Sequence, residues 1–373
     1  MSVKPRPKPK PKRPRGRQPS DDSEEIWQAH NNLFIGALGD PRHAAGVLRS
    51  MLRPEVAAQI RWDTLRRVDT TLVDARLARR HGDLIFQAML GDQPILIYVL
   101  LEHQSDPDDL IPLRLLGYMV RLWERHVASE GLGQGLPPIL PLVLHHGRRG
   151  WRCPESFEAL LPESVRELPE LMRLLPTFDI GVLDLRGARE EELMLLRATS
   201  LARLTLLALK HAPRTRDLLP IIARWQALLA DLDGHPYAER GIQMIFRYIF
   251  SVSNVAVDPV VEVLHSALSS KGRKTVITTA QKLRQEGRQE GLREGLEEGG
   301  QLALSRALME LLTERFGPLD ETTAQRVEGA TTAELGAWLR GVLTADSVES
   351  CLAQGGGVRT RSTPARRRRR PAR

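Results

Sequence analysis

Residues 83–104 read Asp83-Leu-Ile-Phe-Gln-Ala-Met-Leu90, then Gly-Asp-Gln-Pro, then Ile95-Leu-Ile-Tyr-Val-Leu-Leu-Glu-His-Gln104. Two apolar runs of strand length flank four residues that are typical of turns, which predicts a β-hairpin. The second run is apolar almost without interruption and contains β-branched and aromatic residues. That composition is typical of a central strand that is covered on both faces.

The pairing of this hairpin decides which polar side chains meet. A loop of four residues would pair Leu90 with Ile95 and, counting outward, Asp83 with Glu102. Because side chains alternate between the two faces of a strand, Glu102 and Gln104 would share a face. The sequence therefore predicts two carboxylates and a carboxamide at one end of a buried hairpin.

Carboxylates next to an apolar strand are unfavourable unless they are paired or bind a metal ion. Mg²⁺ accepts a few carboxylate oxygens and keeps several waters. Such an ion can lower the pKa of a bound water and neutralise charge that develops on a phosphate. The plainer alternative is that Asp83 and Glu102 are solvated strand ends, and their spacing alone does not decide between the two.

The same stretch carries a family resemblance. The run Tyr98-Val-Leu-Leu-Glu-His-Gln-Ser105, followed by Arg114-Leu-Leu-Gly-Tyr118, resembles the Rpn (YhgA-like) family of bacterial recombination-promoting nucleases, which are also described as transposases. That family belongs to the PD-(D/E)XK nuclease superfamily and has E-x-Q in place of the usual E-x-K. The resemblance implies an α/β fold with a restriction-endonuclease-like core, a mixed central sheet flanked by helices, followed by a helical C-terminal region.

The resemblance also implies roles for site residues. Asp83 and Glu102 would bind the metal ion, and Gln104 would orient the attacking water, a task that the superfamily usually gives to Lys. Glutamine cannot supply positive charge, so turnover could be low. The aspartate of the family's His-Asp-x-x-Phe segment is replaced by Asn31, which would matter if that acid assists the metal or water.

Three further residues are candidates for an outer part of the site. Arg114 and Tyr118 are four residues apart and share a helix face, which is either amphipathic surface or a place where the guanidinium holds the scissile phosphate. Asp74, in a segment that also resembles the family, could support the site, although we favour a purely structural role for it.

His145 and His146 invite comparison with a zinc site. Adjacent residues of a strand point to opposite faces, so the two imidazoles cannot both bind one ion without distortion. We predict that they are strand-end residues.

The nuclease-like domain is predicted over residues 23–210. Helices are expected at 23–37, 41–52, 54–60 and 110–129, and further strands at 65–73, 138–146 and 178–185. A helix that returns the chain to a strand parallel to the hairpin is what such a nuclease core requires. Beyond it we predict a helical extension over 211–281 and a small helical domain over 301–353, where Thr331 and Glu334 have capping-box spacing.

Residues 282–300 contain an internal repeat, with Glu-Gly at 286–287, 290–291, 294–295 and 298–299. Each Gly in a helix costs ~1 kcal/mol relative to Ala, and glutamates four residues apart repel each other. A helix here would be marginal alone, and close pairing with a second copy of the chain would compensate. The alternative is a flexible charged linker. We predict a homo-oligomer that forms through the C-terminal helices.

Basic residues are concentrated at the ends of the chain. Residues 1–20 and 357–373 each carry eight Lys or Arg and no acid, so the net charge is +8 although residues 21–356 carry −8. We predict that residues 1–22 and 354–373 are disordered tails, since they cannot pack a core. Such tails either aid solubility or hold DNA phosphates without regard to sequence.

Two cysteines, Cys153 and Cys351, provide no disulfide framework, which favours a reducing cytoplasm. The sequence has no apolar run near the roughly 20 residues of a membrane span and no signal peptide. We therefore expect a cytoplasmic bacterial protein without membrane contact. Association with the nucleoid is compatible with this expectation.

These observations predict a Mg²⁺-dependent DNA endonuclease linked to recombination. An alternative is an inactive nuclease fold that acts as an oligomeric DNA-binding or interaction protein, which Asn31 and Gln104 slightly favour. A third is a helical scaffold that never contacts DNA. Nothing in the sequence indicates a separate DDE-type active site.

Overall fold

The computed structural model describes residues 21–68, 83–102, 108–133, 135–147 and 149–353. The chain divides into two compact units, Met1–Leu283 and Arg284–Arg373. Gln104, Asp74 and residues 1–20 and 354–373 lie outside the described residues. Asp21 and Asp22, which we predicted to belong to the N-terminal tail, are instead the first two residues of a helix. None of the described helices combines the length and apolar character that crossing a membrane requires.

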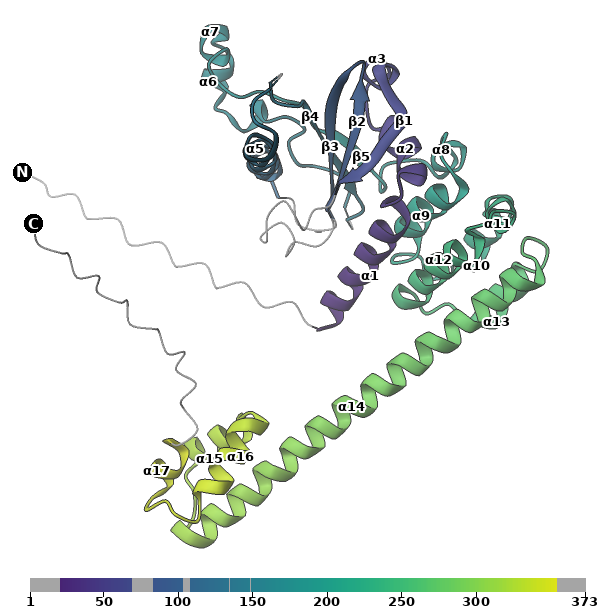
Figure 1. Cartoon of the computed structure of the whole chain (residues 1–373). Coiled ribbons are helices and arrows are strands. Elements are labelled where there is room, and N and C mark those ends of the chain that lie inside the picture. The colour runs from purple at the N-terminus through teal and green to yellow at the C-terminus, as the bar shows by residue number, and fades with distance from the viewer. Residues whose placement is uncertain (1–20, 69–82, 103–107, 134, 148, 354–373) are drawn as a thin grey trace, which may run out of the picture. The chain divides into compact units, whose positions relative to one another are not determined.

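The first unit contains a five-stranded mixed sheet in the order β1-β2-β3-β4-β5 (Figure 1). The strands are β1 (Ile60–Val68), β2 (Asp83–Leu90), β3 (Gln93–Glu102), β4 (Ile139–His145) and β5 (Gly181–Asp184). The first three strands are antiparallel, and β3, β4 and β5 are parallel. The prediction of an α/β fold with a mixed sheet flanked by helices is confirmed, and β3 is the central strand.

The predicted register of the β2–β3 hairpin is wrong by two residues. Asp83 pairs with Leu100 rather than with Glu102. The physical reason is Gly91, whose φ of +59° lies in the left-handed region. Glycine adopts this conformation readily, and it allows the hairpin to turn over two residues instead of four. Strand β3 therefore begins earlier, at Gln93. Because the shift is an even number of residues, every side chain keeps its predicted face.

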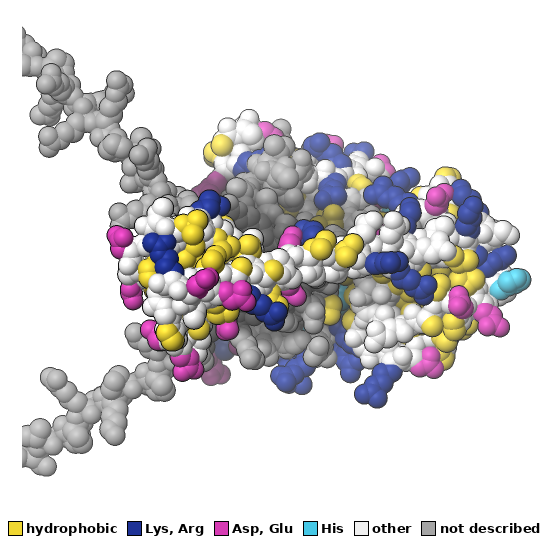
Figure 2. Space-filling view, turned by 90° about the horizontal axis from the view of Figure 1, so that it is seen from below, with side chains coloured by type: hydrophobic (Ala, Val, Ile, Leu, Met, Phe, Trp, Pro, Cys, Tyr) yellow, Lys and Arg dark blue, Asp and Glu magenta, His cyan; other side chains and the backbone are white. Residues whose placement is uncertain are grey.

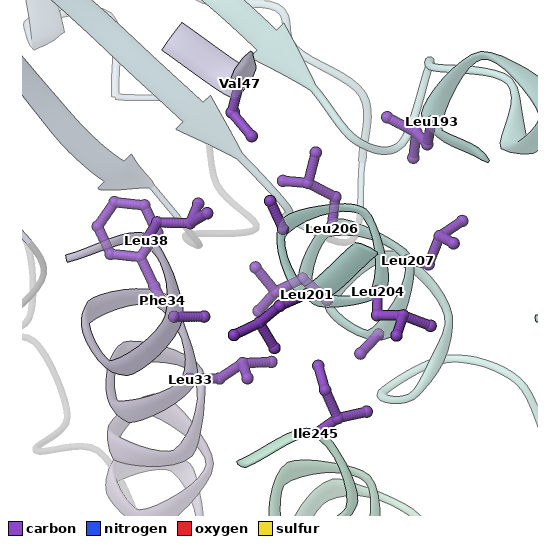
Figure 3. Close-up of a cluster of buried hydrophobic side chains, with 14 of the residues drawn as sticks. Leu33, Phe34, Leu38, Val47, Leu193, Leu201, Leu204, Leu206, Leu207 and Ile245 are labelled. Carbon is purple, nitrogen blue, oxygen red and sulfur yellow. The ribbon is translucent and has the colours of Figure 1, made fainter. Parts of the chain in front are cut away.

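Helices cover both faces of the sheet. Helix α5 (Ile111–Glu130) lies on one face, and α1 (Asp21–Leu38) and α2 (Pro41–Ser50) lie on the other, with α9 (Ser200–His211) packed against both (Figure 1). Figure 3 shows how leucines of α1 and α9 meet in the larger apolar cluster. The predicted helices at 23–37, 41–52 and 110–129 are thereby confirmed, with Asp40 capping α2.

The predicted strand at 65–73 begins earlier, at Ile60, and its residues 69–73 are not described. The other helices among the described residues of the first unit are α3 (Pro54–Gln59), the 3₁₀ turn η1 (Glu158–Leu160), α6 (Glu163–Arg166), α7 (Pro169–Met172), α8 (Glu190–Leu195), α10 (Leu219–Arg224), α11 (Gln226–Asp233), α12 (Ala238–Val252) and α13 (Val257–Val263).

Helix α14 (Ser270–Phe316) is continuous for 47 residues, so the Glu-Gly repeat is helical rather than a linker. It is followed by α15 (Glu321–Glu328), α16 (Thr332–Gly341) and α17 (Val348–Ala353). Leu308 and Leu312 of α14 pack with Trp338 in a small separate core. The predicted capping box of Thr331 and Glu334 is present at the start of α16.

Candidate active site

Asp83 and Glu102 lie on the sheet face that α5 covers. Ile85, two residues after Asp83, and Leu100, two residues before Glu102, both belong to the apolar cluster beneath α5. Since residues two apart on a strand share a face, the two acids share this one. They are diagonal neighbours across the hairpin, a relation that places Cα atoms about 7–8 Å apart. From these positions the side chains of Asp83 and Glu102 extend from the same face of the sheet.

Tyr98 fixes the orientation of Asp83. Its hydroxyl donates a hydrogen bond of 2.5 Å to Oδ2 of Asp83. Burial raises the pKa of Tyr98 well above its ordinary value, and the negative charge of Asp83 and this hydrogen bond raise it further. Tyr98 therefore stays protonated and keeps donating to the carboxylate.

Arg114 lies beside Glu102. Nη2 of Arg114 is 3.3 Å from Oε2 of Glu102, and Nη1 is 2.5 Å from Oδ2 of Asp108. Burial lowers the pKa of Arg114, but the charges of Glu102 and Asp108 outweigh burial and raise it overall. The guanidinium thus compensates the negative charge of Glu102, which is only 5% exposed to solvent.

Two polar residues that the sequence did not single out as a pair complete a row with Glu102. In the parallel part of the sheet, Glu102 pairs with His145 and His145 pairs with Asp184. Nδ1 of His145 is 3.0 Å from Oδ1 of Asp184. All three residues lie at the carboxyl ends of adjacent parallel strands, which is where ligands bind in open α/β sheets. This rule could have pointed to His145 and Asp184 from the sequence, but applying it requires knowing how β4 and β5 align with β3.

Asp184 is held as a carboxylate. Burial raises its pKa, but hydrogen bonds from His145 and from the backbone amides of Trp151 and Arg186 lower it below the ordinary value overall. A charged Asp184 favours the tautomer of His145 that carries a proton on Nδ1. The imidazole is therefore fixed in both orientation and tautomer.

His146 lies on the other face, as predicted for adjacent strand positions. Its ring is 4.4 Å from that of His30, centroid to centroid, and Nδ1 of His30 is 2.9 Å from the hydroxyl of Tyr248. The two consecutive histidines therefore belong to different clusters, and the arrangement provides no shared zinc site.

Tyr118 and Asn31 have different relations to the two acids. The ring of Tyr118 is 5.3 Å from the ring of Tyr98, so Tyr118 supports the residue that holds Asp83. Asn31 is in α1, which packs on the opposite sheet face through Leu33 and its neighbours. Its Oδ1 is buried and has no hydrogen-bond partner among the described residues.

Two carboxylates, Asp83 and Glu102, offer hard oxygen ligands, and Mg²⁺ is usually held by one or two carboxylates and several waters. Within the described ranges, no group of three or more His, Cys, Asp or Glu side chains could hold a metal ion. The predicted contributions of Gln104 and Asp74 fall on residues outside those ranges.

Comparison with known proteins assigns the family. The family model described as "Putative transposase, YhgA-like" matches residues 28–237. The chain is 28% identical over 269 residues to the recombination-promoting nuclease RpnA of Escherichia coli, covering 69% of this chain and 84% of RpnA. It is 26% identical over 263 residues to RpnE of Escherichia coli, which is named an inactive recombination-promoting nuclease-like protein, covering 69% and 82%. No solved structure matches the chain. Because the family model spans more than half of its residues, the chain belongs to the Rpn (YhgA-like) family, within the PD-(D/E)XK superfamily.

Proposed function

We propose that this chain is a Mg²⁺-dependent DNA endonuclease that hydrolyses phosphodiester bonds and acts in recombination. The observation that carries the proposal is the placement of Asp83 and Glu102 on one face of adjacent strands. Similarity to RpnA, which is named a recombination-promoting nuclease, supports the choice of reaction.

In this proposal Asp83 and Glu102 bind the metal ion. When bound, Mg²⁺ lowers the pKa of a coordinated water and offsets charge on the phosphate. Tyr98 holds the Asp83 carboxylate by donating to Oδ2. Arg114 holds Glu102 and offsets its charge. Gln104 orients the attacking water, without the positive charge that a lysine would bring.

DNA is the proposed substrate, and we propose that both basic tails also bind its phosphate backbone. Residues 1–20 and 357–373 each supply eight positive charges. Contacts of this kind do not depend on base sequence and weaken steeply as salt is added. We also propose that the protein works in the bacterial cytoplasm, at the nucleoid, and as a homo-oligomer.

A second function is supported by specific observations. The chain could be an inactive nuclease fold that binds DNA or other partners as an oligomer. Asn31 and Gln104 depart from the acid and the lysine expected of an active site. The relative RpnE is itself named inactive.

Plasmid cleavage separates the two functions. We expect the wild-type protein to nick or cut plasmid DNA with Mg²⁺ and not with EDTA. Asp83→Ala and Glu102→Ala should each reduce cleavage at least ~100-fold, because the metal supplies several kcal/mol of transition-state stabilisation. Asp92→Ala is the matched control, since Asp92 is an exposed carboxylate in the turn of the same hairpin.

Circular dichroism should show that the variants keep the wild-type fold. Cleavage that survives both substitutions in folded protein would exclude the proposed site. A folded wild-type protein that binds DNA but never cleaves it would favour the inactive alternative.

A further inference from the structure

The Glu-Gly repeat of α14 is a helical stretch that the described residues leave exposed. Every described side chain from residue 284 to residue 300 is exposed. Leu292 and Leu296 are 64% and 68% exposed. Figure 2 shows hydrophobic side chains at the surface along the long helix. A Cβ added at Gly287, Gly291 or Gly295 would meet nothing within 4 Å.

Such a helix is poorly stabilised by itself. Each glycine disfavours the helix by ~1 kcal/mol relative to Ala. Most helical stability in proteins comes from packing of one face rather than from intrinsic propensity. Among the described residues, none from 284 to 300 is buried, so a partner that covers this stretch would stabilise it.

The charges identify the partner. Residues 284–288 carry a net +1 and residues 294–298 carry −3. Arg284 and Glu298 lie seven positions before and after Gly291. At 3.6 residues per turn, seven residues bring a side chain to within about 20° of the starting direction. Arg284, Gly291 and Glu298 therefore lie on one face of the helix.

The glycines repeat this symmetry. Gly287 and Gly295 lie four positions before and after Gly291, within about 40° of it around the axis. This face of the helix thus has small residues at its centre, a basic residue at one end and an acidic residue at the other. A two-fold axis through Gly291 would place each end against its opposite charge.

We propose that residues 284–300 pair with the same helix of a second copy of this chain, antiparallel and crossing at Gly291. Arg284 would then face Glu298 of the partner subunit, and the glycines would let the backbones approach closely. A parallel pair would place like charges opposite each other, which is unfavourable. An isologous contact of this kind closes as a dimer. This inference deepens the homo-oligomer part of the proposed function, and its test does not depend on DNA cleavage.

Charge reversal tests the pairing in the full-length protein. Sedimentation equilibrium at low salt should show a wild-type dimer. Arg284→Glu and Glu298→Arg should each weaken the dimer about tenfold, since two symmetry-related pairs of up to about 1 kcal/mol each are lost. The double variant should restore wild-type affinity. Arg306→Glu is the control, because Arg306 is exposed on the same helix but outside the repeat.

A wild-type monomer, or a double variant no tighter than either single variant, would overturn the proposal. DNA cleavage by such a monomer would leave the nuclease assignment standing while removing the pairing.

Cross-linking tests the direction. Gly291→Cys lies at the proposed two-fold axis and should form a disulfide with itself across the dimer. Gly295→Cys should not, because antiparallel pairing separates its two copies by about 12 Å along the axis, beyond the roughly 7 Å limit between Cα atoms. Non-reducing gels compare each variant with the wild type, which retains Cys153 and Cys351. Cross-linking of both variants would indicate a parallel pair, and cross-linking of neither would exclude a crossing at Gly291.

Discussion

The two faces of the central sheet are built from the same strands and differ in content. One face, against α1 and α9, contributes Leu84, Phe86 and Val99 to a large apolar cluster. The other, beneath α5, begins apolar but ends in acids, with Asp83 and Glu102 near the carboxyl end of β3. Strand alternation separates the two sets. One sheet can therefore keep a continuous core on one side while collecting charged groups on the other.

The polar end of the α5 face is organised by partners. Asp83 accepts from Tyr98, Glu102 contacts Arg114, and His145 contacts Asp184. Buried charges require such compensation, whereas apolar groups require only good packing. Substitutions on the apolar face should therefore lower stability by loss of packing, and those on the polar end by loss of charge compensation. The sizes of these effects should also differ.

The largest effect on stability is expected from the apolar face. Phe86→Ala removes a fully buried ring and should lower the free energy of unfolding by about 3–5 kcal/mol. Urea unfolding followed by circular dichroism measures the change. Val56→Ala, at a position 37% exposed, should change it by less than about 0.5 kcal/mol. Equal effects at both positions would mean that this face is not the core.

Arg114→Met should come next. It leaves Glu102 without its guanidinium partner, which for a fully buried pair costs about 3–5 kcal/mol. Because the Arg114 side chain is 24% exposed, we expect a smaller loss of about 2 kcal/mol in the urea experiment. Arg49→Met, at an exposed position of α2, is the control. A neutral effect of Arg114→Met would show that Glu102 is adequately solvated without it.

Tyr98→Phe removes one hydroxyl and keeps the packed ring. Loss of a hydrogen bond to a charged group should lower stability by about 1.5 kcal/mol. The comparison is Tyr118→Phe, which removes the hydroxyl of the neighbouring ring. If both substitutions lower the free energy of unfolding equally, the hydrogen bond to Asp83 contributes no more to stability than the Tyr118 hydroxyl does.

The smallest effect concerns pH. The pKa of Asp184 is lowered in the folded protein, so its contribution to stability is present above its unfolded pKa of about 3.9 and is lost as the pH falls through the folded value. Wild type should be more stable than Asp184→Asn near pH 6, and this difference in the free energy of unfolding should shrink as the pH falls below about 4. Asp179→Asn, at an exposed acid, is the control. A gap that widens toward low pH would contradict the assignment.

Much of this contrast could be predicted from local sequence. The apolar run of β3 indicated a central strand, and alternation placed Asp83 and Glu102 on one face. The error in register came from Gly91, since counting four turn residues ignored its left-handed conformation. Because the register was wrong by an even number of residues, each side chain was still assigned to the correct face of the sheet.

The row of Glu102, His145 and Asp184 could not be predicted in the same way. It depends on how β4 and β5 align with β3, and this alignment is set by contacts between segments far apart in the chain. The sequence alone offered two adjacent histidines and an isolated aspartate. The role proposed for Gln104 stays a prediction.

The central claim is that Asp83 and Glu102 share one metal ion. Electron paramagnetic resonance of Mn²⁺, used in place of Mg²⁺, measures binding directly and without DNA. We expect one bound ion per chain in the wild type, and a large loss of binding in both Asp83→Asn and Glu102→Gln, with Asp92→Asn unchanged. Binding that persists in either of the first two variants at wild-type affinity would contradict the shared site.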